Sequence, residues 1–188
     1  MDTILYLIRH VESSANDVVT ESGLQQAQSL ANALSKTEID LIISSPYQRA
    51  IHTVKPFSEI AQIPIQMNDG LKERKVSEGF IRNFLDVIKK SWIDFDFKLP
   101  NCESARECQK RLVKTLNGIV SNHYGKKILI SSHGNAIALV LNAFDHSFGF
   151  EDWENLNNPD IKKIVYSHDT QFWDKEFELK FEYSNNFH

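Results

Sequence analysis

The chain has 188 residues, a hydrophobic fraction of 41%, a charged fraction of 24% and a formal net charge of −4 at pH 7. This length suits one domain with a good core, so we expect a single domain over residues 1–188. The negative charge argues against a general nucleic-acid binder, which needs a basic face. No segment approaches the ~20 apolar residues of a membrane span, and the apolar run between Asp2 and Arg9 is too short for a signal peptide. A cytoplasmic location is therefore expected.

The cysteine and histidine spacings indicate no metal site. Cys102 and Cys108 are the only cysteines, their separation fits no zinc-ligand pattern, and we interpret them as reduced thiols of a cytosolic protein. The seven histidines form no H-x-H or H-E-x-x-H cluster. We therefore expect neither a metal ion nor another cofactor.

The first part of the chain alternates between strand and helix patterns. The apolar run over 4–8 predicts a short buried strand. Apolar residues at helical spacing over 24–34 predict a helix whose buried stripe begins at Leu24. Thr20 or Ser22 is expected to cap this helix.

Two prolines mark the elements that follow. After a second strand over 39–44, Pro46 is expected to start a helix, because the N–H of a first-turn residue is unbonded in any case. Pro56 is expected to end or bend that helix. The run over 63–67 predicts a short edge strand, the position at which a strand tolerates proline.

The pattern loosens between residues 70 and 100. A short amphipathic helix and the aromatic run over 92–97 suggest an insertion, and we interpret 70–100 as a lid over the strand ends. Regular patterns then return as a helix, a strand, a helix and two more strands, over 105–119, 128–131, 137–143, 161–166 and 177–183. The alternation predicts an α/β fold: a three-layer α/β/α sandwich with a mostly parallel sheet and a small helical lid.

Cationic residues follow three of the predicted strands. Arg9 and His10 follow the first strand, Arg49 follows the second after a Ser-Pro turn, and His133 follows the strand over 128–131. Ligands of open α/β sheets collect at such strand ends. The sequence therefore predicts a pocket for an anionic group, in which a histidine is suited to attack phosphorus.

These residues resemble the motifs of the histidine phosphatase superfamily, the phosphoglycerate-mutase-like clan. Smaller matches keep the same order along about residues 3–145. The full set is Arg9-His10 with Asn16 (R-H-G-E-x-x-x-N), Thr20 to Ala27 (L-T-x-x-G-x-x-Q-A), Ser45-Pro46-x-x-Arg49-Ala50, Leu71-Lys72-Glu73-Arg74 (L-x-E-R), Glu103-Ser104 (G-E-S) and Ser132-His133-Gly134. One tripeptide is weak evidence for a family, whereas the ordered combination at strand ends is strong.

The resemblance implies a phosphate pocket. His10 would be the nucleophile and carry the phosphoryl group as phosphohistidine; a buried structural histidine is the alternative. Arg9 and Arg49 would bind the phosphate, because guanidinium presents paired donors to two oxygens. His133 would donate a hydrogen bond to a transferring oxygen. Asn16 would be an auxiliary donor, with an ordinary turn residue as the alternative.

Glu73 is the candidate general acid, because it matches the L-x-E motif and because protonation improves an alkoxide leaving group. Glu78 is the competing carboxylate in the same loop. Several neighbours have two interpretations each. Two interpretations are open for Glu12, Lys72 and Arg74: they face the mouth of the pocket, or they are solvated surface residues. Two interpretations are also open for Trp92, Phe95 and Phe97: they line a pocket for the leaving group, or they pack within the lid.

One position departs from the family pattern. Val11 stands where the family usually has glycine after the nucleophile. Valine takes a positive φ only at high cost. Either the backbone is β-like at this position, or the loop is displaced and activity is lowered.

The expected function is metal-independent hydrolysis of a small phosphorylated metabolite, a phosphomonoester, through phosphohistidine. The cationic pocket would supply the charge stabilisation that a metal ion otherwise gives. Phosphoglycerate mutase is the alternative within the same class; the short segment from Arg74 to Pro100 favours the phosphatase, because a small lid admits water. A pseudo-enzyme that only binds phosphorylated ligands is the alternative from another class, and Val11 alone supports it. The sequence identifies neither the substrate nor the oligomeric state.

Overall fold

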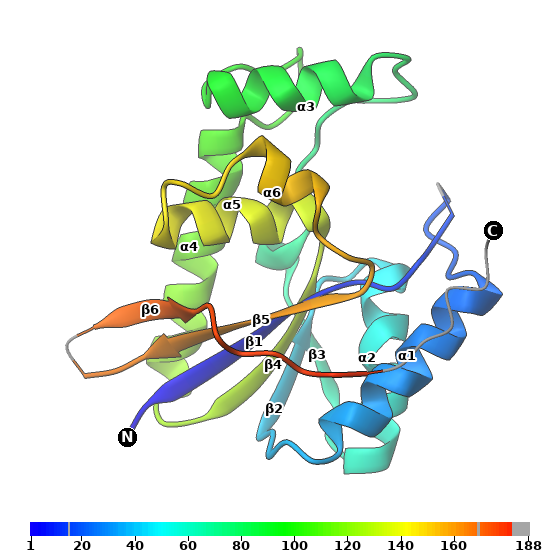
Figure 1. The fold of residues 1–188 in the computed structure, drawn as a ribbon, viewed down its shortest axis with the longest axis vertical. Coiled ribbons are helices and arrows are strands. Elements are labelled where there is room, and N and C mark those ends of the chain that lie inside the picture. The colour runs from blue at the N-terminus through cyan, green and yellow to red at the C-terminus, as the bar shows by residue number, and fades with distance from the viewer. Residues whose placement is uncertain (15, 169, 182–188) are drawn as a thin grey trace.

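A mixed six-stranded sheet lies at the centre of the computed structural model, which describes residues 1–14, 16–168 and 170–181 (Figure 1). The strand order within these residues is β3-β2-β4-β1-β5-β6. The first four strands in this order pair in parallel, and β5 and β6 are antiparallel. The strands are β1 (Thr3–Arg9), β2 (Leu41–Ser44), β3 (Ile65–Met67), β4 (Lys127–Ser132), β5 (Asp160–Tyr166) and β6 (Gln171–Asp174).

Helices cover both faces of this sheet (Figure 1). One face carries α1 (Glu21–Leu34) and α2 (Gln48–Ala61), and the other carries α4 (Ala105–Asn122) and α5 (Gly134–Phe144). The shorter helices are η1 (Asp69–Leu71), α3 (Phe84–Ile93) and α6 (Phe150–Glu154). The result is the three-layer α/β/α sandwich that the alternating pattern predicts. None of the helices described is long and apolar enough to cross a bilayer.

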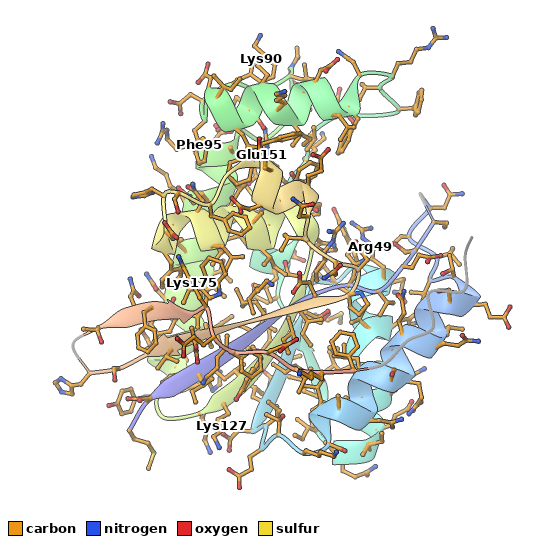
Figure 2. The ribbon with its side chains drawn as sticks, in the orientation of Figure 1. Arg49, Lys90, Phe95, Lys127, Glu151 and Lys175 are labelled. Carbon is orange, nitrogen blue, oxygen red and sulfur yellow. The ribbon has the colours of Figure 1, made fainter. Side chains whose placement is uncertain are left out.

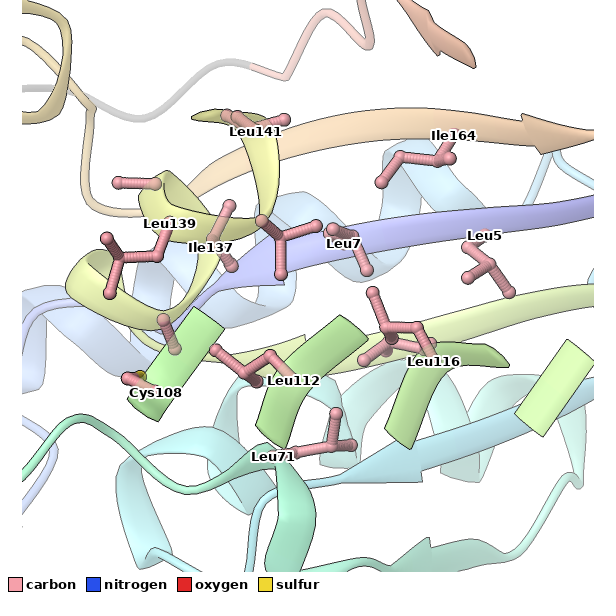
Figure 3. Close-up of a cluster of buried hydrophobic side chains, with 14 of the residues drawn as sticks. Leu5, Leu7, Leu71, Cys108, Leu112, Leu116, Ile137, Leu139, Leu141 and Ile164 are labelled. Carbon is pink, nitrogen blue, oxygen red and sulfur yellow. The ribbon is translucent and has the colours of Figure 1, made fainter. Parts of the chain in front are cut away.

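The alternation of side chains along β1 explains the layers, because successive residues of a strand point to opposite faces. Leu5 and Leu7 pack in the cluster with α4 and α5, whereas Tyr6 and Ile8 pack in the cluster with α1 and α2. Figure 3 shows Leu5 and Leu7 beside Leu116 of α4. Each such side chain, when fully buried, stabilises the fold by about 1.5–3 kcal/mol. The register of β1 is therefore fixed from both faces.

This register aligns the C-terminal ends of three strands. Arg9 at the end of β1 pairs with Ser132 at the end of β4, and β2 ends beside them at Ser44. The residues that follow these strands consequently emerge at one edge of the sheet, where ligands bind in α/β folds. Arg49 lies toward this edge and Lys127, the first residue of β4, lies at the opposite end (Figure 2).

The start of α1 follows the expected cap but not the expected stripe. The Thr20 hydroxyl accepts a hydrogen bond from Gly23 N at 3.0 Å, as an N-cap does. Leu24, predicted to be buried, is 54% exposed. Gln26 is buried instead, and its side-chain oxygen accepts a hydrogen bond from Glu12 N at 2.9 Å. A polar residue with a partner thus replaces an apolar one in the buried stripe.

Pro56 does not end its helix, so the first of the two alternatives predicted for it, an end or a bend, is wrong. Helix α2 begins at Gln48, two residues after Pro46, and continues past Pro56 to Ala61. Val54 and Phe57 are almost completely buried against the sheet on either side of the proline. We attribute the continuation to this packing, because tertiary contacts of an apolar face supply most helical stability in proteins.

The predicted strand over 177–183 is also wrong in its described part: 177–181 form no strand, and residues 182 and 183 lie outside the described residues. The second tail strand is β6, which pairs with β5. The segment after β6 crosses the sheet toward α1 (Figure 1) and packs Phe177 against Tyr6, with ring centroids 5.4 Å apart. Its alternating pattern therefore reflects one-sided packing and not ladder pairing.

Residues 76–104, named the α3 segment from here on, extend the molecule beyond α6 (Figure 1). Arg74 joins this segment to the loop that carries Glu73. Its Nη1 donates to Ser91 Oγ at 2.7 Å and its Nε donates to the Glu103 carbonyl at 3.0 Å, and the residue is 4% exposed. Arg74 is thus a buried structural residue, which neither the mouth nor the solvent interpretation anticipated.

Candidate active site

The aligned strand ends bring His10, Arg49 and His133 together. His10 follows β1 and His133 follows β4, and their ring centroids lie 5.3 Å apart. Arg49 lies in the first turn of α2, and its Nε donates a hydrogen bond to His10 Nε2 at 3.1 Å. These three residues, the strand-end cluster from here on, therefore place one guanidinium and two imidazole rings at the edge where the sequence predicts an anion pocket.

The hydrogen bonds of His10 assign its tautomer. Nδ1 lies 2.7 Å from the Val11 carbonyl oxygen, which can only accept, so Nδ1 carries the hydrogen. Nε2 then keeps its lone pair and accepts from Arg49 Nε. Burial, together with the charges of Arg49 and Arg9, lowers the pKa of His10 to about 4. The ring is therefore neutral at pH 7, with its Nε2 lone pair toward the guanidinium.

Val11 fits its position without the flexibility of glycine. Positive φ among the described non-glycine residues is confined to Asp17, Gln62 and Asn101. The Val11 side chain is fully buried, and its N–H donates to Thr53 Oγ1 at 3.0 Å. The same Thr53 hydroxyl donates to the Arg49 carbonyl at 2.6 Å. Thr53, to which no sequence motif points, thus ties the loop after His10 to α2.

Arg9 lies beside the glycine that follows His133. Its Nη1 donates to the Leu156 carbonyl at 2.6 Å, while Nε is buried with no partner among the described residues. A Cβ atom at Gly134 would lie only 3.1 Å from Arg9 Nε. Gly134 therefore makes room for this guanidinium.

His133 is completely buried against β2. Its Nε2 lies 2.7 Å from Ser45 Oγ, and its Nδ1 has no partner among the described residues. Burial, followed by the charges of Arg49 and His10, lowers the pKa of His133 to about 2. The ring is therefore neutral and carries a single N–H.

Glu73 lies at the N-terminus of α5, the helix that starts directly after His133. One carboxylate oxygen accepts from Arg74 N at 2.8 Å and from Ala136 N at 3.0 Å, and the other accepts from Asn135 N at 3.2 Å. The positive end of the helix favours a carboxylate there. These bonds aim Glu73 at the same edge as His133.

Glu78, the competing carboxylate, lies elsewhere. It is exposed, and Lys75 Nζ and Asn101 Nδ2 donate to it at 3.2 and 3.4 Å. The Lys75 hydrogen bond lowers the pKa of Glu78. The geometry therefore separates the two carboxylates, with Glu73 alone of the pair near His133.

Asn16 makes no hydrogen bond to the cluster among the described residues, whereas its neighbour Asp17 does. Asn16 is exposed, and its side chain makes no hydrogen bond to the described part of the chain. Asp17 accepts from Arg49 Nη1 at 2.8 Å and from Gln48 N at 2.7 Å, so it caps α2 from a distant loop. Asp17 has φ 64°, a conformation that Asn and Asp tolerate better than most residues. The tolerance of aspartate for a positive φ is the one feature of the sequence that indicates a special position for Asp17.

The loop of Glu73 is held by an arginine from far along the chain. Arg111 of α4 binds Glu103 through Nε at 2.8 Å and Nη2 at 2.7 Å. Its Nη1 also donates to the Gly70 and Lys72 carbonyls at 2.8 and 3.1 Å. Glu103, known in the sequence only as a motif match, therefore helps to position the carboxylate loop.

Two aromatic residues of the α3 segment line a different cavity. Trp92 and Phe95 contribute to a cavity of about 630 Å³ shared with Phe148 and Phe150. Phe95 and Arg49 lie well apart in Figure 2. None of the residues at the strand-end cluster lines this cavity. The packing interpretation of Trp92 and Phe95 therefore agrees better with the structure than a leaving-group pocket.

Comparisons with known proteins give a consistent result. Residues 5–178 match the sequence model of the histidine phosphatase superfamily (branch 1). The chain is 28% identical over 155 residues to a putative phosphoserine phosphatase 2 of Hydrogenobacter thermophilus, covering 73% of this chain and 76% of that protein. It is 23% identical over 184 residues to a probable phosphoglycerate mutase GpmB of Escherichia fergusonii, covering 86% and 84%. A crystal structure of a mutant phosphoserine phosphatase from Entamoeba histolytica with phosphoserine superposes with a TM-score of 0.77 at 22% identity, over 95% of this chain and 96% of that one, which shows the shared fold.

Proposed function

The chain belongs to the histidine phosphatase superfamily (branch 1), and from this we propose that it hydrolyses small phosphomonoesters through a phosphohistidine on His10, without a metal ion. The observation that carries the proposal is the state of the His10 ring. Its Nδ1–H is committed to the Val11 carbonyl, and its Nε2 lone pair faces Arg49. A neutral nucleophile is thus held beside a phosphate-binding guanidinium.

In the first step Nε2 of His10 bonds to phosphorus while the bond to the leaving oxygen breaks. Glu73 takes up the proton of the bound phosphomonoester monoanion and gives it to that oxygen, and the alcohol departs. The hydrogen bond from Nδ1 to the Val11 carbonyl stabilises the positive ring of the phosphohistidine. Arg49 exchanges its hydrogen bond to Nε2 for one to a phosphoryl oxygen. The ion pair between Arg49 and Asp17 is kept during this exchange.

In the second step water attacks phosphorus and the bond to Nε2 breaks. Glu73, now a carboxylate, takes the proton of the attacking water. Glu73 passes this proton to the inorganic phosphate, which leaves, and His10 and Glu73 return to the neutral ring and the carboxylate. The same carboxyl group therefore serves as acid and then as base, so no proton is left unaccounted for.

Two buried donors without partners support the binding of an oxyanion. Arg9 Nε and a nitrogen of His133 lack partners among the described residues, and buried polar groups are normally hydrogen-bonded. Phosphoryl oxygens would supply the missing acceptors. Charge that develops on these oxygens during transfer would be stabilised by preorganised donors.

Phosphoglycerate mutase is the competing function, supported by the similarity to the probable mutase of Escherichia fergusonii. The two functions differ in what receives the phosphoryl group. We propose water, because the segment over 74–100 is short, and a small lid would admit water to the phosphohistidine.

The test is a screen of phosphomonoesters, including phosphoserine and 3-phosphoglycerate, for phosphate release in the presence of EDTA. We expect release that survives EDTA and greatly exceeds any isomerisation of phosphoglycerate. Fast isomerisation primed by bisphosphoglycerate would establish the mutase instead. Activity that disappears with EDTA and returns with a divalent ion would contradict the metal-free mechanism.

A further inference from the structure

Ser45 is a buried serine within hydrogen-bond distance of the His133 ring. It follows β2, and its N–H donates to the Ser131 carbonyl at 2.9 Å, so its backbone is fixed by the sheet. Its hydroxyl oxygen lies 2.7 Å from His133 Nε2 and accepts from Tyr47 N at 3.4 Å. Ser45 is fully buried. The hydrogen of the hydroxyl therefore needs an acceptor that belongs to the protein.

Counting hydrogens assigns the direction of the bond between Ser45 and His133. The hydroxyl has one hydrogen to donate, and Tyr47 N, itself a donor, cannot receive it. If His133 Nε2 accepts this hydrogen, one group is left without a partner, the Nδ1–H. If Nε2 donates instead, both the Ser45 hydrogen and the Nδ1 lone pair are left without partners. Unmade buried bonds are costly, so the first arrangement is the more stable.

We propose that Ser45 is a positioning residue that fixes His133 as the Nδ1–H tautomer and thereby provides the donor for a transferring phosphoryl oxygen. The donor role rests on the proposed function, whereas the tautomer rests on the hydrogen bonds alone. Neutral His133 has only one hydrogen to give, so its location decides whether the ring can donate to a ligand.

The same tautomer then serves opposite purposes in the two histidines. In His10 the Nδ1–H is bound by the Val11 carbonyl, which leaves Nε2 as a nucleophile. In His133 the Ser45 hydroxyl occupies Nε2, which leaves Nδ1–H as a donor. The Val11 carbonyl thus leaves His10 with an acceptor nitrogen, and the Ser45 hydroxyl leaves His133 with an N–H donor. The centroids of the two rings lie 5.3 Å apart.

The direct test is nitrogen-15 NMR of the histidine side chains of the full chain, with the His133 signals assigned by their loss in His133→Gln. We expect the wild-type ring to show a protonated Nδ1 and an unprotonated Nε2 at pH 7. We expect inorganic phosphate to shift the Nδ1–H signal. A wild-type ring protonated at Nε2 would overturn the proposal without any variant, and an Nδ1–H signal unmoved by saturating phosphate would overturn the donor role.

Ser45→Ala should shift the His133 tautomer and lower kcat by ~10-fold or more, because one preorganised donor is lost. Adding Ser45→Ala to His133→Ala should produce no further loss, since the two residues act as a unit. Ser131→Ala is the matched control: this buried serine of β4 bonds to the Ala50 carbonyl, and its loss should leave the tautomer unchanged.

An unchanged tautomer in Ser45→Ala, or fully additive losses of kcat, would overturn the role of Ser45. A confirmed tautomer in a chain that hydrolyses no phosphomonoester would instead refute the proposed function and the donor role with it, and leave the assignment of the ring intact. The two failures are therefore distinguishable.

Discussion

The strand-end cluster and the α3 segment differ in how completely their side chains are buried. At the strand ends, short hydrogen bonds link buried or half-buried groups, as between His10 and Val11 and between His133 and Ser45. The α3 segment is attached through the buried Arg74, and it leaves large apolar residues such as Phe80 in solvent. The difference teaches that the sheet sets the chemistry of the site, while the α3 segment contributes none of the groups to which we assign that chemistry.

The largest expected effect tests the chemical side of this comparison. Glu73→Gln should lower kcat for alkyl phosphates by ~10²-fold or more, because their leaving oxygen needs a proton. An activated aryl phosphate needs none and should lose much less. Glu78→Gln is the matched control and should leave both rates unchanged, since Glu78 is on the surface. Equal losses for both substrates in Glu73→Gln would assign this residue another role.

A smaller effect is expected from a single methyl group in the pocket. Gly134→Ala would bring Cβ to 3.1 Å from Arg9 Nε and 3.2 Å from its Cζ. The displaced guanidinium should lower kcat/KM by roughly 10-fold, because small errors in the position of a binding group are costly. Gly118→Ala in α4 is the control, since a methyl group added there would meet no neighbouring atom within 4 Å. Full activity in Gly134→Ala would show that Arg9 does not need this space.

Weakening the attachment of the α3 segment is expected to lower the stability of the fold and to leave the rate of turnover unchanged. Ser91→Ala removes the acceptor of Arg74 Nη1 and should lower the free energy of unfolding by about 1–3 kcal/mol, because a buried donor is left unpaired. The turnover of a small aryl phosphate should not change. Ser121→Ala on the exposed side of α4 is the control and should change neither quantity. Denaturant titration measures the difference, and a large loss of aryl-phosphate kcat in Ser91→Ala would remove the distinction between the two regions.

The smallest expected effect is a pH dependence of stability that originates at the strand ends. The pKa of His133 is about 2 in the folded chain and about 6.5 in an unfolded one. Below pH 6.5 the unfolded state therefore binds more protons, so the free energy of unfolding falls as the pH falls, by on the order of 1 kcal/mol per pH unit. His133→Gln should lose less stability than the wild type between pH 7 and pH 5. Equal losses would contradict a buried neutral ring.

The sequence predicts the sheet well because its signals are local. The alternation in β1 and the motifs after β1, β2 and β4 require no knowledge of distant residues. A helix end at Pro56 and a strand over the described residues 177–181 are the wrong predictions, because tertiary packing decided both. A local pattern reports which side of a segment is buried, but not whether its backbone pairs.

The site was predictable to the extent that it consists of strand ends. The approach of His10, Arg49 and His133 follows from parallel pairing. The contribution of Asp17 depends on a loop reaching α2, and the support from Arg111 depends on contacts 39 and 41 positions away along the chain. Such long-range hydrogen bonds leave no local pattern in a single sequence.

Rapid-quench labelling with a radiolabelled phosphomonoester tests the central claim most directly. We predict a phosphoprotein that is labile in acid and stable in base, present in the wild type and in the exposed-histidine control His146→Ala, and absent in His10→Ala. An acid-stable label, or a label that persists in His10→Ala, would contradict phosphohistidine formation at this residue.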